Sequence, residues 1–178
     1  SLVTEAIRIQ ISPKDPVGKN ITHAVAFIEM DDKRFFLEEL VKSNKEKKIL
    51  VFVRTKIRAE RVKKAMDRVE LISDTIHSDK EQKEREQTMQ SFRHGDLKVL
   101  IATDVSARGI DIPNVELVVN YDLPESIENY VHRVGRTGRG MEKGEAISFC
   151  SSEEKEVLDS IEKNLEKPIR RLEILKGD

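Results

Sequence analysis

The feature that most restricts the fold of this chain is a regular alternation of short apolar runs with amphipathic stretches of helical period. Residues 48–53 are continuously apolar after one lysine, which is typical of a parallel strand covered on both faces. Residues 56–69 instead place apolar side chains three or four positions apart, which is typical of a surface helix. Strands that alternate with helices in this way predict an α/β fold with a doubly wound, mostly parallel sheet, flanked by helices on both faces.

The same patterns predict where the elements begin and end. Two helix-start signatures stand out, Asp79 with Gln82 and Ser151 with Glu154, each pairing a capping residue with Glu or Gln three positions later. Ligands bind such sheets beyond the carboxyl ends of the strands, so the loops after Val53, Ile76, Ala102 and Tyr121 are candidate sites. The predicted strands are 23–29, 48–53, 71–76, 97–102, 116–121 and 145–150, and the predicted helices are 31–43, 56–69, 79–92, 126–135 and one that starts at 151 and stops before 168.

Length and composition indicate one globular domain. The chain has 178 residues, 38% hydrophobic and 37% charged, and its apolar runs are far shorter than the roughly 20 residues that span a bilayer. We expect a cytoplasmic or nuclear protein without membrane contact. A single cysteine, Cys150, allows neither a disulfide framework nor a cysteine-ligated metal site, and we expect no bound metal on this chain. We expect a domain at residues 21–167, a linker or N-terminal extension at 1–20 and a C-terminal tail at 168–178.

The net charge of −1 hides a local bias toward bases. Residues 45–64 contain nine Lys or Arg and only two Glu. One face of the protein can therefore attract polyanions.

The loop after the predicted strand 97–102 could bind phosphate. Thr103 and Asp104 stand at the end of the strand, and Gly109 follows in a turn where backbone N–H groups can approach phosphate oxygens. The alternative is an ordinary strand-to-helix loop in which Thr103 and Asp104 are caps.

A second segment, residues 132–140, carries Arg133, Arg136 and Arg139 three positions apart and interleaved with glycines. Such arginines suit the charge on a transferred phosphoryl group, although a solvated arginine face is an alternative. The chain has neither a GxxxxGK[ST] phosphate loop nor an acidic pair after a strand to hold magnesium. These arginines therefore serve a site on another domain, or no nucleotide at all.

Four segments together resemble a known family. VFVRTK at 51–56, QKER at 82–85, ATDVSARGIDIP at 102–113 and YVHRVGRTGRG at 130–140 are similar, in order and spacing, to the motifs of the second RecA-like domain of DEAD-box RNA helicases. The resemblance runs from about residue 22 to 165.

The resemblance implies a role for each matching position. It implies that Arg136 and Arg139 are arginine fingers for ATP, and that Gly109 and Asp111 help to bind the nucleotide, with Asp111 at the ribose. ATP and Mg would be held mainly by an N-terminal RecA-like domain that this sequence lacks. The remaining matches are Thr55, Gln82, Arg85 and Thr103, which would hold the RNA sugar-phosphate backbone, and His132 and Arg133, which would contact the other domain.

Three of these positions also have a purely structural explanation: capping for Thr55 and Gln82, and a solvated helix face for Arg85. We expect the C-terminal domain of an ATP-dependent RNA helicase, monomeric and inactive by itself as an ATPase. The alternatives are a related DNA helicase domain and a stand-alone RNA-binding or partner-docking module without catalysis.

Overall fold

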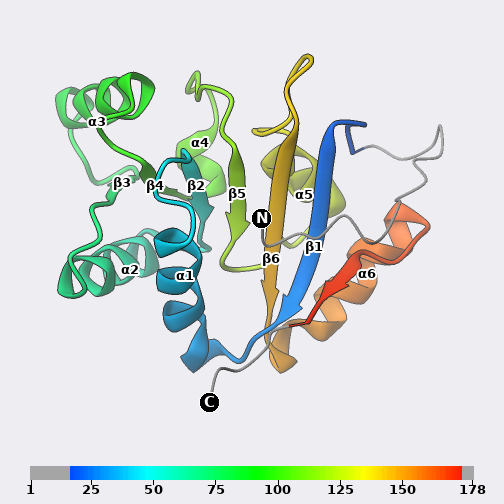
Figure 1. Cartoon of the computed structure of the whole chain (residues 1–178). Coiled ribbons are helices and arrows are strands. Elements are labelled where there is room, and N and C mark those ends of the chain that lie inside the picture. Colours follow the sequence, from blue (N-terminus) through cyan, green and yellow to red (C-terminus); the bar gives the residue numbers. More distant parts are fainter. Residues whose placement is uncertain (1–16, 174–178) are drawn as a thin grey trace.

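The computed structural model describes residues 17–173. Its centre is a seven-stranded sheet in the order β3-β4-β2-β5-β6-β1-β7, and every pair of neighbouring strands is parallel (Figure 1). The predicted doubly wound sheet is therefore confirmed. The strands are β1 (Ile21–Phe27), β2 (Ile49–Phe52), β3 (Asp74–Ile76), β4 (Val99–Ala102), β5 (Leu117–Asn120), β6 (Gly144–Cys150) and β7 (Arg170–Leu172).

Helices cover both faces of the sheet, because the central strands are apolar on both sides. One core lies under α1 and α2 and contains Leu37, Val62 and Val51. The other lies under α3, α5 and α6 and contains Phe92, Tyr130 and Leu158. The helices are α1 (Lys33–Lys42), α2 (Lys56–Arg68), α3 (Gln82–His94), α4 (Asp104–Ala107), α5 (Ile127–Val134) and α6 (Lys155–Leu165), with single 3-10 turns at η1 (Met30–Asp32) and η2 (Ser152–Glu154).

Strand register brings the candidate loops to one edge. Phe52 at the end of β2 pairs with Ala102 of β4 and with Asn120 of β5, and Ala102 also pairs with Ile76 of β3. The segments after these four strands therefore meet at the carboxyl edge of the sheet, as the sequence predicts.

Some local predictions are wrong. The helix after β3 begins at Gln82 with Glu81 as its N-cap, and Asp79 does not cap it but accepts a hydrogen bond from Lys56 Nζ (3.0 Å). The predicted helix 56–69 is one residue too long, because α2 ends at Arg68 and Val69 is its C-cap, 37% exposed. The signature of Ser151 and Glu154 is confirmed, because the two residues form a reciprocal capping box.

Two elements have no counterpart among the predictions. The short helix α4 follows β4 directly, and β7 pairs with β1 at the edge of the sheet, within the segment predicted to be a tail. The predicted linker, apart from residues 17–20, and the last five residues of the predicted tail lie outside the described residues. No helix within residues 17–173 is long and apolar enough to cross a membrane.

Candidate functional site

Arg133 is the centre of a buried polar network at the carboxyl edge. Its side chain is 3% exposed and donates to both carboxylate oxygens of Asp104, at 2.7 and 2.8 Å. The same guanidinium donates to Asn120 Oδ1 (3.2 Å) and to the carbonyl oxygen of Asp122 (2.6 Å), and it lies over the ring of Phe52. Arg133 therefore ties α5 to the segments that follow β4 and β5.

Lys33 is the centre of a second network, next to the first. Its side chain is fully buried, and its Nζ donates to Glu154 Oε1 (2.5 Å) and to the carbonyl oxygen of Tyr121 (2.6 Å). Asp122 Oδ1 lies 3.8 Å from Lys33 Nζ and 2.5 Å from Arg58 Nη1, and Asp122 Oδ2 accepts from the backbone N–H of Arg54. Asp122 thus anchors the segment that enters α2.

Glu154 completes the second network. It accepts from the backbone N–H of Leu123 (2.8 Å) and from both the N–H and the hydroxyl of Ser151 (3.1 Å each). Burial by itself raises the pKa of Glu154, but these hydrogen bonds and the Lys33 charge outweigh it and hold the pKa below its ordinary value.

The sequence reading missed Lys33, Asp122 and Glu154 as members of a polar network. One signal was available for Lys33, because it lies four residues before Leu37 and seven before Leu40, on the buried face of α1. A lysine at such a position needs a carboxylate partner, since an unpaired charge is costly to bury.

Arg136 and Arg139 lie in the loop that follows α5, which is pinned to residues 112–115. Val115 N–H donates to the Arg136 carbonyl, and the Thr137 hydroxyl donates to the Val115 carbonyl. Arg139 reaches back to the same segment, with its Nη1 on the Ile112 carbonyl (3.1 Å) and its N–H on Asn114 Oδ1 (3.0 Å). These hydrogen bonds hold the segment after α4 next to the loop that carries Arg136 and Arg139.

Arg136 is half-buried and close to two other charged groups. Burial lowers the pKa of Arg136, the nearby Arg139 charge lowers it further, and Asp111 opposes both effects. Its guanidinium forms no ion pair or hydrogen bond within residues 17–173. Arg136 is partly desolvated, is repelled by the Arg139 charge and has no carboxylate within ion-pair distance among the described residues. Such a guanidinium is suited to bind an anion.

The backbone beside these side chains is open. Gly109 has a φ of +72°, and a Cβ placed there would have nothing within 4 Å. Asp111 is exposed, and its carbonyl accepts from Arg93 Nη2 (3.0 Å), which fixes the turn. Gly109, Asp111 and Arg139 are exposed and Arg136 is half-buried. The groups of these four residues fit a phosphate and a hydroxyl-bearing sugar.

Thr55 and Thr103 both cap helices at this edge. The Thr55 hydroxyl accepts from Arg58 N–H, and the Thr103 hydroxyl accepts from Ser106 N–H in a capping box. The capping alternative is thus confirmed for Thr55. Asp104 does not cap α4, because its carboxylate is taken by Arg133. Within the described residues the Thr55 hydroxyl only accepts, so its O–H can still donate to another ligand. The Thr103 hydroxyl both accepts from Ser106 N–H and donates to Ser106 Oγ (3.1 Å).

Gln82 and Arg85 lie together at the start of α3. Arg85 Nη2 donates to Gln82 Oε1 (2.7 Å), and Gln82 Nε2 donates to Glu86 (3.2 Å). Gln82 makes no capping bond for this helix, which contradicts the capping alternative. Arg85 Nε is buried without a hydrogen-bond partner, so this guanidinium keeps an unsatisfied donor.

The two residues predicted to contact the other domain, His132 and Arg133, lie in different environments. His132 is exposed on α5, whereas Arg133 points into the domain and is occupied by Asp104. Within residues 17–173, no group of three or more His, Cys, Asp or Glu is placed to hold a metal ion.

The sequence profile described as helicase conserved C-terminal domain matches residues 32–141. The chain therefore belongs to this family. Among similar proteins, ATP-dependent RNA helicase DbpA of Bacillus subtilis is 38% identical over 165 residues, which is 93% of this chain and 34% of DbpA. The chain thus spans about a third of that relative.

Similar solved structures also belong to DEAD-box proteins. The E. coli DEAD-box protein SrmB, bound to regulator of ribonuclease activity A, is 31% identical with a TM-score of 0.81, covering 88% of this chain and 92% of that one. S. cerevisiae Dbp5, bound to RNA and ADP BeF3, is 32% identical with a TM-score of 0.79, covering 95% of this chain and 46% of that one. The resemblance to the C-terminal RecA-like domain of DEAD-box RNA helicases is thereby confirmed.

Proposed function

We propose that this chain is the C-terminal half of an ATP-dependent RNA helicase and supplies arginine fingers to ATP held mainly by an N-terminal RecA-like domain. The observation that carries the proposal is Arg136, whose guanidinium lies beside Asp111 and Arg139 and forms no ion pair within the described residues. A side chain held in this state at the surface is prepared for an anion that another domain brings.

In this proposal, Arg136 and Arg139 stabilise the charge that spreads over the γ-phosphate during transfer. Asp111 accepts a hydrogen bond from the ribose, and the open backbone at Gly109 allows the nucleotide to come close. The phosphate loop and the Mg ligands belong to the N-terminal domain. Magnesium, when bound there, neutralises charge on the phosphates.

The same proposal assigns the RNA backbone to Thr55, Thr103, Gln82 and Arg85. Thr55 stands at the N-terminus of α2, where backbone N–H groups and the helix dipole favour phosphate. Thr103 begins the short turn α4 at the same edge of the sheet. The positive charge of Arg85, whose Nη2 is held by Gln82, adds a further attraction for phosphate at the start of α3. Contacts of this kind do not read base edges, so we expect little sequence preference.

ATP and RNA would then close two loosely joined domains, with the exposed His132 at their interface, and hydrolysis would release them. Arg133 has a different part in this picture. It positions α5 and the loop of Arg136 from inside the domain, through Asp104.

The test is RNA-stimulated ATP hydrolysis by this chain joined to its matching N-terminal helicase domain. We expect no hydrolysis from the chain by itself, RNA-dependent hydrolysis from the joined protein, and a loss on the order of 10³-fold in Arg136→Ala. Lys143→Ala, which removes an exposed cation beyond the same loop, should hydrolyse normally. Activity in Arg136→Ala equal to that of the unaltered protein would refute the arginine-finger role, and stimulation by DNA rather than RNA would favour the DNA helicase alternative.

A further inference from the structure

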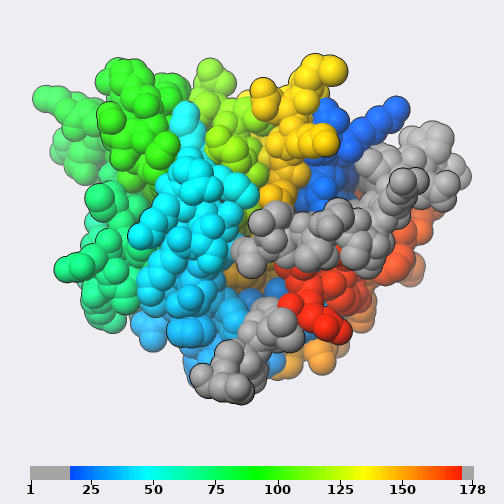
Figure 2. Space-filling view, in the orientation of Figure 1, coloured from blue at the N-terminus to red at the C-terminus, as the bar shows by residue number. Residues whose placement is uncertain are grey.

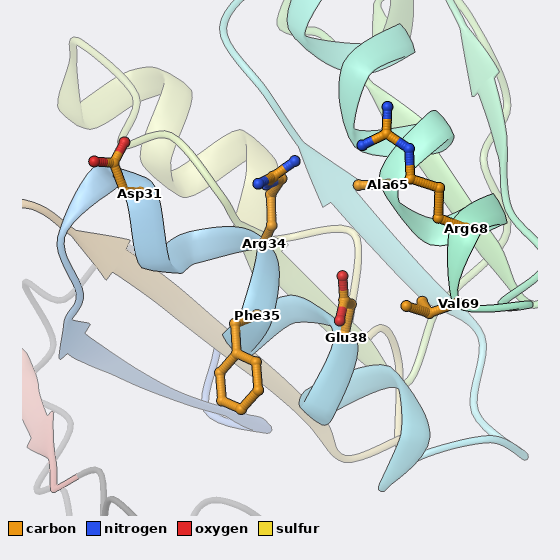
Figure 3. Close-up of a pocket in the computed structure, with 7 residues that line it drawn as sticks. All are labelled: Asp31, Arg34, Phe35, Glu38, Ala65, Arg68 and Val69. Carbon is orange, nitrogen blue, oxygen red and sulfur yellow. The ribbon is translucent and has the colours of Figure 1, made fainter.

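A groove runs between α1 and α2, on the face of the domain opposite α5 and α6. Figure 3 shows one end of it, with Asp31, Arg34, Phe35 and Glu38 on the side of η1 and α1, and Ala65, Arg68 and Val69 on the side of α2. This end has a volume of about 290 Å³. The other end, of about 460 Å³, shares Asp31, Arg34 and Arg68 and extends to Tyr121 and Arg58 at the carboxyl edge. Both helices lie at the surface on the near side of the space-filling view (Figure 2).

One wall of the groove is a row of cations on α2. Arg58, Arg61, Lys64 and Arg68 follow one another at three-residue or four-residue spacing and line the groove together with Arg34 of α1. Ten residues of helix rise about 15 Å, so the row is as long as an extended segment of about five residues.

Within residues 17–173, four of these five cations lack acidic partners, whereas Arg58 pairs with Asp122 (2.5 Å). This sets the four apart from other cations on α2. Lys56 pairs with Asp79 (3.0 Å) and Lys63 pairs with Asp67 (3.1 Å). Within residues 17–173, Arg34, Arg61, Lys64 and Arg68 form no ion pair. Like charges one turn apart destabilise a helix, and bound carboxylates would relieve that repulsion.

Each wall also contributes one exposed apolar side chain, Phe35 on α1 and Val69 at the end of α2. Phe35 is 57% exposed and Val69 is 37% exposed, and both line the same end of the groove. A large aromatic ring left in solvent beside unpaired arginines is typical of an interaction site.

We propose that this groove docks a short acidic segment of a partner protein that also carries an apolar side chain. The acidic side chains pair with Arg61, Lys64 and Arg68, and the apolar side chain packs on Phe35 and Val69. An RNA strand fits less well, because it carries a charge at every nucleotide and would bring phosphates past Asp31 and Glu38, which line the groove. A peptide can place its carboxylates at Arg61, Lys64 and Arg68 and an uncharged residue beside Asp31 and Glu38. The docking site is separate from Arg136 and does not depend on the helicase role.

The test begins with a phage-displayed library of random twelve-residue peptides, panned on the 178-residue chain. The selected peptide is then synthesised with a fluorescein label, and its affinity is measured by fluorescence anisotropy. We expect acidic sequences with one large apolar residue. Arg61→Glu, Lys64→Glu and Arg68→Glu together should weaken binding at least about tenfold, since several exposed ion pairs are lost. Phe35→Ala should weaken it several-fold at the same salt concentration.

A matched variant carries Lys143→Glu, Lys155→Glu and Lys163→Glu, which change the net charge equally at exposed positions outside the groove. It should bind the peptide as the unaltered chain does, and both triple variants should keep their circular dichroism melting curves. If the α2 triple variant does not fold, the Gln triple variant at the same positions replaces it. The proposal is overturned if no acidic peptide is enriched, if binding survives the α2 changes, or if single-stranded RNA competes for the groove and loses affinity in the same variants.

Discussion

Arg133 of α5 and Asp104 of α4 form a two-pronged ion pair, with Nε to Oδ1 at 2.7 Å and Nη2 to Oδ2 at 2.8 Å. The two residues are 29 positions apart in sequence and come from the two segments that resemble helicase motifs. Because Arg133 also binds the Asp122 carbonyl, one side chain fixes the segments after β4 and β5 relative to the loop of Arg136.

We predict that Arg133→Ala lowers the free energy of unfolding by about 3 kcal/mol, because it leaves the partly buried Asp104 carboxylate and a buried carbonyl without their donor. Arg108→Ala, at an exposed arginine beside α4, should change it by no more than about 0.5 kcal/mol. Urea unfolding of both variants checks this. A double-mutant cycle with Asp104→Ala then measures the coupling free energy between Arg133 and Asp104. Equal stability of the two arginine variants would show that the Arg133–Asp104 pair does not stabilise the domain.

Acid should destabilise the domain through Glu154. Its folded pKa lies below the ordinary value of 4.5, because hydrogen bonds and Lys33 outweigh the effect of burial. The charged carboxylate therefore contributes its full stability above about pH 4.5, and this contribution is lost as the pH falls through the lower folded pKa. Asp74, Glu60 and Glu162 are shifted in the same direction.

The check is urea unfolding at neutral pH and at several pH values below 4.5. In Glu154→Gln we expect a weaker domain at neutral pH and a shallower loss of stability in acid, because the titrating group is gone. Glu156→Gln, on the next turn and exposed, should follow the unaltered chain. An acid dependence in Glu154→Gln as steep as in the unaltered chain would assign the effect to other carboxylates.

At Thr55, a single substitution separates capping from RNA binding. Asp caps helices at least as well as Thr, so Thr55→Asp should keep the free energy of unfolding within about 0.5 kcal/mol. Its carboxylate would repel a phosphate, so affinity for single-stranded RNA should fall several-fold in the joined two-domain protein. Thr55→Ser serves as the control and should keep both properties. Unchanged RNA affinity in Thr55→Asp would show that Thr55 caps α2 and does not bind RNA.

Two glycines of the arginine loop should respond differently to alanine. Both have positive φ, +65° at Gly138 and +62° at Gly140, so each change costs about 1 kcal/mol of backbone strain. A Cβ at Gly138 would also lie 2.6 Å from Ile21 Cγ1, whereas one at Gly140 would meet nothing within 4 Å. We expect Gly138→Ala to cost about 1–3 kcal/mol more than Gly140→Ala. Thermal unfolding of the two variants decides this, and equal costs would show that β1 yields to the added methyl.

Much of the secondary structure could be predicted from local sequence patterns. The continuous apolar run of β2 and the helical period of α2 are legible in the sequence, because each depends on side chains within one element. The motif around Arg136 is equally legible, since arginines interleaved with glycines suit neither a core nor a regular helix. The same holds for the Ser151 and Glu154 capping box, whose partners are three residues apart.

Tertiary structure decided the rest. Neither the order of the strands nor the addition of β7 beside β1 follows from local pattern, because strand pairing joins residues far apart in sequence. The family resemblance implied an interdomain role for Arg133, and no role was predicted for Lys33. The structure buries both side chains and pairs Arg133 with Asp104 and Lys33 with Glu154. The physical reason is that a charge can be buried only where a distant residue supplies its partner, and the fold alone brings the two together.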